Sequence, residues 1–149
     1  MNYILQIFQN TILQTAVISW FTAQMLKVIL VIITERRVDF TRITGSGGMP
    51  SSHSSFTVSL AAAVGFVEGF DSIIFGISAA FSLVVMYDAS GVRRSAGQQA
   101  VILNKIVEKI GKEEVSETGK KLKELLGHTP LEVFAGAILG LIIAIIRYV

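Results

Sequence analysis

The sequence predicts an all-α integral membrane protein, a helical bundle with about four membrane-embedded helices plus one or two amphipathic helices. Of its 149 residues, 52% are hydrophobic and only 16% are charged, well below the usual quarter in soluble domains. Four apolar runs alternate with polar connections. The length corresponds to a single domain, which we take as residues 1–149.

The first apolar run extends from residue 3 to about residue 33. The part from residue 11 onward is long enough to cross a bilayer, which takes about 20 residues. Gln24 and Lys27 are three residues apart and therefore share one helix face. A lysine in such a segment is costly unless it lies near the interface or faces a polar interior. Lys27 is thus either a snorkelling side chain or a phosphate ligand between helices.

Two shorter apolar runs, residues 54–70 and 72–87, follow a polar connection at residues 34–52. Each run is about 16 residues, or roughly 24 Å as a helix, which is short for a hydrocarbon layer of about 30 Å. Gly76 and Ala80 are four residues apart in the second run. Small residues at this spacing let helices approach closely in a membrane.

A long polar segment, residues 88–128, precedes the last apolar run at residues 131–149. From Val92 to Ile110, apolar side chains recur every three or four residues, which predicts an amphipathic helix. A second helical piece is expected at residues 115–126, ended by Gly127. The last run is long enough to span a bilayer.

The charged residues indicate how the chain is oriented. Every lysine and arginine except Lys27 and Arg147 lies in the two polar loops, residues 34–53 and 88–130. The positive-inside rule places these loops in the cytoplasm of a multi-pass protein of the cell membrane. The net charge of +2 is too small to indicate a nucleic-acid partner, and the absence of cysteine excludes disulfides and thiolate chemistry.

The residues from Gly47 to Ser55 carry one of the two histidines, His53. Pro50 suits the first position of a helix or the turn before it, and the serines that follow are good N-cap residues. A helix that begins here directs unpaired N–H groups and its positive dipole end forward, where phosphate binds readily. The stretch is therefore either a phosphate site with a proton-exchanging His53 or a capped helix start with an incidental histidine.

The second histidine, His128, lies just before another helix start. Thr129, Pro130 and Glu132 form a capping box, with threonine as N-cap and glutamate at the third position. Glu132 is therefore expected to cap the helix. The same carboxylate can also accept a hydrogen bond from the imidazole of His128 and stabilise its cationic form.

Two histidines, several arginines and a lysine at helix starts are the groups that phosphoryl transfer without a metal requires. One imidazole attacks phosphorus, another protonates the leaving oxygen, and cations stabilise the equatorial oxygens. We expect no cofactor and no metal. The arginines near these helix starts are Arg36, Arg37, Arg93 and Arg94.

These motifs resemble a known superfamily. Pro50-Ser51-Ser52-His53 is similar to the Pro-Ser-Gly-His motif of the type-2 phosphatidic acid phosphatases and vanadium haloperoxidases, and His128-x-x-x-Glu132 to their His-x-x-x-Asp motif. The run from Tyr87 to Arg94, together with Gly47-Gly48-Met49 and Leu126-Gly127-His128, resembles the small divergent branch of that superfamily.

The resemblance implies a role for each matching residue. His128 would be the nucleophile, Glu132 its orienting carboxylate and His53 the general acid. Phosphate would be held by Ser52 and the amides around Gly48, by Lys27, by Arg36 or Arg37, and by Arg93 or Arg94, with Asp88 in support. Here Glu132 stands where the superfamily has aspartate, and Thr34 stands where its first motif has arginine.

Three functions are compatible with these residues. The first is hydrolysis of a lipid phosphate monoester or diphosphate through a phosphohistidine. The second is a non-catalytic membrane protein that binds or moves a phosphate-bearing lipid, and the third is a structural module that docks a partner through its basic helix. A haloperoxidase is disfavoured because a membrane-level site suits lipids. Assembly into a homo-oligomer is left open.

Overall fold

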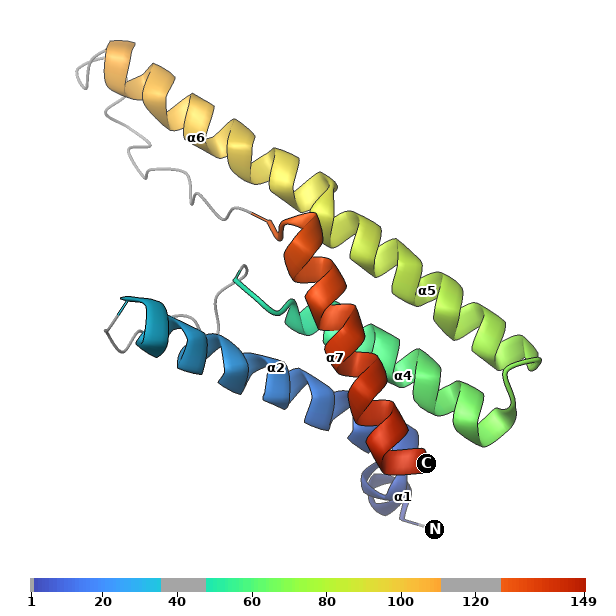
Figure 1. The fold of residues 1–149 in the computed structure, drawn as a ribbon. Helices are drawn as coiled ribbons and strands as arrows, with labels where there is room; N and C mark the ends of the chain where they lie inside the picture. Colours follow the sequence, from blue (N-terminus) through green and yellow to red (C-terminus); the bar gives the residue numbers. More distant parts are fainter. Residues whose placement is uncertain (1, 36–47, 111–126) are drawn as a thin grey trace.

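The computed structural model of the protein describes residues 2–35, 48–110 and 127–149. Figure 1 shows long helices packed into a bundle, with a further helix that continues the line of one of them beyond the bundle. The described residues form six helices, namely α1 (Tyr3–Gln9), α2 (Thr11–Glu35), α4 (Ser52–Glu68), α5 (Ile73–Ser90), α6 (Val92–Ile110) and α7 (Pro130–Tyr148). The all-helical fold class is confirmed for these residues. The helix expected at residues 115–126 lies outside them.

Side-chain caps set the starts of helices that include α4, α5 and α7. The Ser51 hydroxyl accepts a hydrogen bond from the amide of Ser54, so Ser51 is the N-cap of α4 and Pro50 lies before it. Ser72 caps α5 in the same way, and Thr129 caps α7. Helix α4 ends at Glu68, and its C-cap Gly69 has a positive φ of 96°, which suits a residue without a Cβ. The apolar runs therefore predicted the ends of the long helices to within about three residues, but they did not predict the break at Asn10 between α1 and α2.

Helix α4 occupies the centre of the bundle and contacts α2, α5 and α7. Its buried side chains are small or carry hydroxyl groups: Ser52, Ser54, Ser55, Thr57, Ser59, Ala61, Ala62, Ala63, Val64 and Gly65. On α7, Gly136 and Gly140 face α4, and a Cβ at Gly140 would lie 2.5 Å from the carbonyl oxygen of Ser55. A Cβ at Gly136 would collide with the Ser51 carbonyl. These glycines let the two backbones approach closely.

Among the described residues, three stretches are long and apolar enough to cross a membrane: Thr11–Thr34, Ile73–Ile106 and Pro130–Tyr148. Helix α4 has 17 residues, about 25 Å of helix, and it is embedded among these three. Helices α5 and α6 follow each other almost in line across Gly91 (Figure 1). The expected set of four membrane-embedded helices plus an amphipathic helix is thus present, with the shortest of the four innermost.

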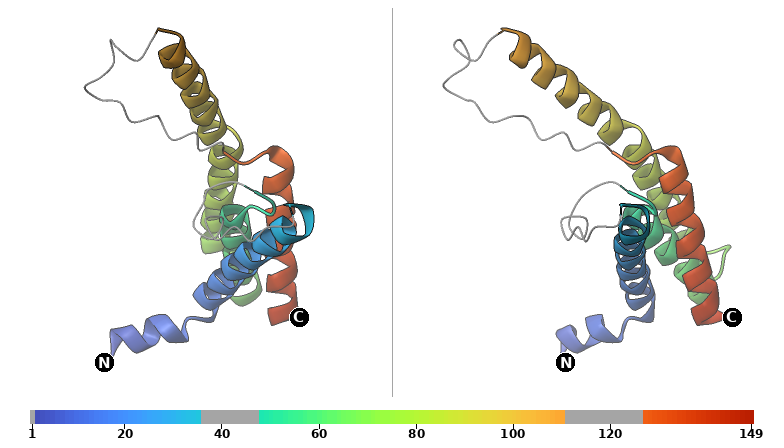
Figure 2. Two further views of the ribbon diagram at one scale, coloured as in Figure 1. Left: turned by 90° about the vertical axis from the view of Figure 1, so that its left-hand side faces the viewer. Right: turned by 60° about the vertical axis from the view of Figure 1, so that its left-hand side comes forward.

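The two ends of the chain lie at the same end of the bundle (Figure 1). Figure 2 shows α1 projecting sideways from the bundle at this end. Here Arg147 donates a hydrogen bond to Gln14, and the Thr15 hydroxyl bonds to the Tyr148 hydroxyl at 3.2 Å. The starts of α4 and α7 lie at the opposite end, where the two histidines meet.

Candidate functional site

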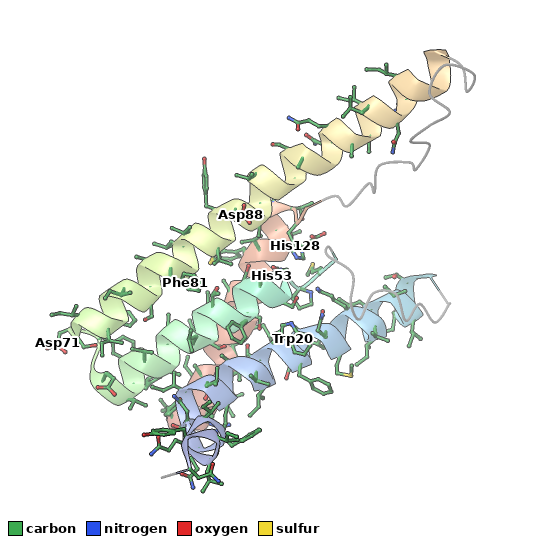
Figure 3. The ribbon with its side chains drawn as sticks, turned by 180° about the vertical axis from the view of Figure 1, so that it is seen from behind. Trp20, His53, Asp71, Phe81, Asp88 and His128 are labelled. Carbon is green, nitrogen blue, oxygen red and sulfur yellow. The ribbon has the colours of Figure 1, made fainter. Side chains whose placement is uncertain are left out.

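The starts of α4 and α7 are joined by a backbone hydrogen bond. The amide of Ser51 donates to the carbonyl oxygen of Glu132 at 2.9 Å. This bond fixes the first turn of α4, which carries His53, against the first turn of α7, which follows His128. Figure 3 shows the two histidines side by side. Their ring centroids are 5.9 Å apart, and the rings meet at 69°.

His128 is held from two sides. Its amide donates to the carbonyl oxygen of Ala89, at the end of α5, over 3.1 Å. Its Nδ1 lies 3.0 Å from Oε2 of Glu132. An ionised carboxylate can only accept a hydrogen bond, so Nδ1 carries the proton and Nε2 keeps its lone pair. Nε2 is buried and has no hydrogen-bond partner among the described residues.

Glu132 performs both of the tasks predicted for it. Its amide donates to the Thr129 hydroxyl at 3.3 Å, and its Oε2 accepts from the Thr129 amide at 3.2 Å. This is the predicted capping box. The same Oε2 also binds the imidazole of His128. The helix cap therefore holds the carboxylate in the position that orients His128.

Lys27 faces the interior of the bundle. Its side chain reaches the start of α4, where Nζ donates to the hydroxyl of Ser52 at 3.2 Å, and the residue is only 3% exposed. Of the two alternatives for Lys27, the snorkelling side chain is therefore wrong. A buried ammonium group beside a helix N-terminus places positive charge next to the two histidines. Gln24, one turn earlier on the same face of α2, is also buried.

The environment of His128 keeps its imidazole neutral. Burial lowers the pKa of His128 below its ordinary value of 6.5. The hydrogen bond that His128 donates to Glu132 opposes this shift in pKa, whereas the charge of Lys27 adds to it. A neutral imidazole with its free lone pair on Nε2 is a nucleophile at neutral pH.

Gly48 lies beside these groups. Its φ of 82° is in the left-handed region, and the position that a Cβ would take is 4.0 Å from Cδ of Lys27. Asp88 lies on the last turn of α5 and is half-buried, one residue before the Ala89 carbonyl that binds His128. Figure 3 shows Asp88 near the same end of the bundle as the histidines.

Of the arginines predicted to hold phosphate, the structure describes the side chain of Arg94 alone. Arg94 lies in the first turn of α6, and no hydrogen bond or ion pair joins it to either histidine within the described residues. The side chain of Arg93 lies outside the described part of the chain, as do Arg36 and Arg37. Their predicted role in holding phosphate stays a prediction. The structure thus brings together Lys27, Gly48, Ser52, His53, His128 and Glu132.

Two contacts that position the site were missed by sequence reasoning. The carbonyl oxygens of Ala89 and Glu132 hold the amides of His128 and Ser51, respectively. Both are main-chain groups, which every residue carries, so no residue type marks them. Among the described residues, no group of three histidine, cysteine or acidic side chains could hold a metal ion.

Comparison with known proteins decides the family. The pattern of the "Divergent PAP2 family" matches residues 8–143, which includes both histidines, Lys27 and Glu132. The chain belongs to this family. The resemblance noted from the sequence motifs is thereby confirmed, and the protein is a membrane protein of a divergent phosphatase-like group.

A similar protein supports the assignment as a membrane protein. The chain is 38% identical over 152 aligned positions to "Uncharacterized membrane protein YuiD" of Bacillus subtilis (strain 168), with 95% of this chain and 96% of the relative covered. No solved structure matches the chain.

Proposed function

We propose that this divergent PAP2 family member hydrolyses a lipid phosphate or diphosphate through a phosphohistidine intermediate. The observation that carries the proposal is the state of His128. Its Nδ1 is held at 3.0 Å from the Glu132 carboxylate, its Nε2 is buried without a partner among the described residues, and a second imidazole lies 5.9 Å away. This arrangement resembles an activated nucleophile beside an acid–base partner.

In the first step, Nε2 of His128 attacks phosphorus and forms an N–P bond. The P–O bond to the leaving oxygen breaks, and its electron pair stays on that oxygen. His53, in its protonated form, donates a proton to the leaving oxygen. Glu132 stabilises the positive charge that develops on the imidazole of His128. Lys27, Ser52 and the N-terminus of α4 stabilise the negative charge on the equatorial oxygens.

In the second step, water hydrolyses the phosphohistidine. His53, now neutral, removes a proton from the water as its oxygen attacks phosphorus. The N–P bond breaks, its electron pair returns to Nε2 of His128, and inorganic phosphate leaves. His53 is protonated and His128 neutral again, so the cycle needs no metal or cofactor.

A lipid is the substrate class that fits this location. Lys27, Ala89 and Glu132 belong to stretches that are long and apolar enough to span a membrane. The site that they form is therefore close to the level of the lipid phosphates. His128 is only 2% exposed. A phosphate group can therefore reach Nε2 only if neighbouring groups move, and such opening toward the lipid headgroups would exclude most soluble esters.

The test is phosphate release by purified protein. The substrates are diacylglycerol phosphate, an isoprenyl phosphate and an isoprenyl diphosphate, each dispersed in detergent. We expect inorganic phosphate to be released from at least one of them, and His128→Ala to reduce release to background. Release that is equal in wild type and His128→Ala would exclude this site as its source.

The burial of His128 and Lys27 favours a second candidate function, binding without hydrolysis. A buried His128 and Lys27 can bind a phosphate-bearing lipid without cleaving it, as a carrier or sensor would. In that case no phosphate is released, but vanadate or phosphate still raises the melting temperature, because both bind only the folded protein. A protein that shows neither effect would be a structural membrane module.

We also propose that the histidine end of the bundle faces the cytoplasm of the cell. The lysines and arginines of the two polar loops support this orientation. The protein has no cysteine, so single cysteines can be introduced at Asp71, in the turn before α5, and at Ser95, on α6. In intact cells, a membrane-impermeant thiol reagent should label Asp71→Cys and spare Ser95→Cys. The reverse pattern would invert the orientation.

A further inference from the structure

An apolar groove lies between the end of α5 and the start of α7. It has a volume of about 280 Å³ and is lined by Met86, Tyr87, Ser90, Pro130, Val133 and Phe134. Among the described residues that line it, Tyr87 and Ser90 are the ones that carry hydroxyl groups. The Ser90 hydroxyl donates to the carbonyl oxygen of Met86 within its own helix, so it offers no strong polar contact to a ligand.

The groove adjoins the histidine site along both of its walls. On α5, Ala89 binds the amide of His128 at 3.1 Å, and its neighbour Ser90 lines the groove. On α7, Glu132 binds the imidazole, and its neighbour Val133 lines the groove. Each wall of the groove is therefore one residue along the chain from a group that holds His128.

The groove opens at the level of the membrane. Both walls belong to stretches that are long and apolar enough to span a bilayer, Ile73–Ile106 and Pro130–Tyr148. The aromatic side chains at its rim, Tyr87 and Phe134, are 76% and 62% exposed. An apolar chain can thus pass from the surrounding lipid into the groove without crossing water.

We propose that this groove holds the first segment of the hydrocarbon chain of a phosphate-bearing lipid whose headgroup lies at His53 and His128. The inference rests on the proposed phosphate site. The groove orients the lipid rather than adding much affinity, because a hydrocarbon chain that moves from the bilayer into an apolar groove gains little hydrophobic free energy. Holding the chain fixes the ester oxygen relative to the two imidazoles.

The distance between lipid and groove can be probed with single introduced cysteines, because the native sequence contains no cysteine. A bimane fluorophore is attached to Ser90→Cys, in the groove, and to Val84→Cys, a 66% exposed position on α5 outside the groove. Each labelled protein is placed in phosphatidylcholine vesicles that contain an equal fraction of either doxyl-labelled diacylglycerol phosphate or doxyl-labelled phosphatidylcholine. The doxyl group sits at the same chain position in both lipids, so depth cancels in the ratio of the two quenching efficiencies.

We expect the phosphate lipid to quench bimane more strongly than phosphatidylcholine at residue 90, and both lipids to quench it equally at residue 84. Vanadate, which competes for the headgroup site, should return the ratio at residue 90 to one. A ratio of one at residue 90 without vanadate would overturn the proposal, as would a preference that vanadate leaves unchanged.

The outcome is separable from that of the proposed hydrolysis. A vanadate-sensitive preference at residue 90 without phosphate release would keep the groove and reject the enzyme. Phosphate release with equal quenching at both positions would keep the enzyme and reject the groove. Filling the groove with Ser90→Trp adds a kinetic readout, because kcat/KM for a long-chain lipid phosphate should fall about tenfold to a hundredfold. The vanadate-induced rise in melting temperature should persist in this variant.

Discussion

Helices α4 and α5 are nearly equal in length but differ in what covers them. Helix α4 has 17 residues, ten of them buried, whereas α5 has 18 residues, of which Ser82 and Ala89 are buried. The buried face of α4 consists of serine, threonine, alanine and glycine with one valine. The exposed residues of α5 include Ile73, Ile77, Leu83 and Val84. The more apolar helix is therefore on the outside.

The difference shows what drives packing in this protein. In a bilayer, lipid chains solvate large apolar side chains as well as other helices do, so association depends on close approach and hydrogen bonds. Helix α4 provides both, through small side chains and hydroxyl groups. Its interior position also brings its polar first turn, with Ser52 and His53, against Lys27 and His128. The predictions that follow start from this contrast and run from the largest expected effect to the smallest.

The largest effect is expected on the rate of phosphate release when the buried charge of Lys27 is removed. Lys27→Met keeps the length of the side chain but removes the charge that faces the site. Losing one preorganised charge-stabilising group typically costs about 10²–10³-fold in kcat, and we expect phosphate release to fall by that factor. The control is Arg147→Met, which removes an exposed charge at the other end of α7. Equal rates in the two variants would show that the Lys27 charge does not act on the site.

The glycines provide a matched pair of packing variants. A Cβ at Gly136 collides with the Ser51 carbonyl of α4, whereas a Cβ at Gly76 on α5 has no atom within 4 Å. Gly136→Ala should lower the free energy of unfolding by about 1–3 kcal/mol through overpacking. Gly76→Ala should leave it unchanged or raise it by up to about 1 kcal/mol through helix propensity. Thermal unfolding in detergent measures both, and equal destabilisation would refute the contrast between the two helices.

A smaller effect is expected from the interhelical serine pair. Ser19 donates to the carbonyl oxygen of Ser55 at 3.0 Å, and Ser55 donates to that of Ser19 at 3.2 Å. Ser55→Ala should destabilise the protein by about 0.6–1 kcal/mol, the usual range for such bonds between membrane helices. Among the described residues, the Ser78 hydroxyl on α5 donates to the carbonyl oxygen of Phe75 in its own helix and to no other helix. Ser78→Ala should therefore have no measurable effect, and a larger loss in Ser78→Ala than in Ser55→Ala would contradict the account.

The smallest effect concerns pH. Because burial lowers the pKa of His128 below 6.5 in the folded protein, the unfolded chain binds a proton there more readily than the folded one. The free energy of unfolding should therefore be highest above pH 6.5 and decrease as the pH falls toward the lowered pKa. His128→Asn should lose this component of the slope. An identical slope in wild type and variant would show that His128 does not titrate as its burial requires.

The activity profile tests the same group. Phosphate release should persist below pH 6.5 and fall only when His128 becomes protonated. Glu132→Gln removes the carboxylate that raises the pKa of His128. In that variant the acid limb of the pH–rate profile should move to lower pH. The maximal rate should decrease, because no carboxylate stabilises the positive charge that develops on His128. A shift to higher pH would assign the limb to another residue.

The sequence predicts the elements of this fold well because membrane helices are marked by long apolar runs and by caps. Pro50 with its serines and Thr129 with Glu132 placed the starts of α4 and α7 close to where they lie. The spacing of Gln24 and Lys27 likewise indicated a polar face of α2. These signals are local, so they can be recognised in the sequence without any knowledge of how the helices are arranged.

The arrangement itself was not predictable in the same way. Hydropathy does not distinguish a lipid-covered helix from a protein-covered one, so nothing in the apolar runs assigned α4 to the centre. The backbone contacts of Ala89 and Ser51 fix both histidines but involve no special residue type. Arg93 or Arg94 was expected to join the histidines. Within the described residues Arg94 makes no hydrogen bond or ion pair with either histidine, and the expectation for Arg93 stays a prediction.

The central claim is that His128 is the group that receives phosphate. The most direct measurement is to incubate purified protein with diacylglycerol phosphate or an isoprenyl phosphate labelled at phosphorus, then denature it rapidly and determine the protein-bound label. The account predicts a bound phosphoryl group that is stable in alkali and lost in acid, present in wild type and absent from His128→Ala. In His53→Ala the bound group should form more slowly, because the leaving oxygen lacks its acid. Phosphate release by wild type without any bound phosphoryl group, or an unchanged label in His128→Ala, would contradict the account.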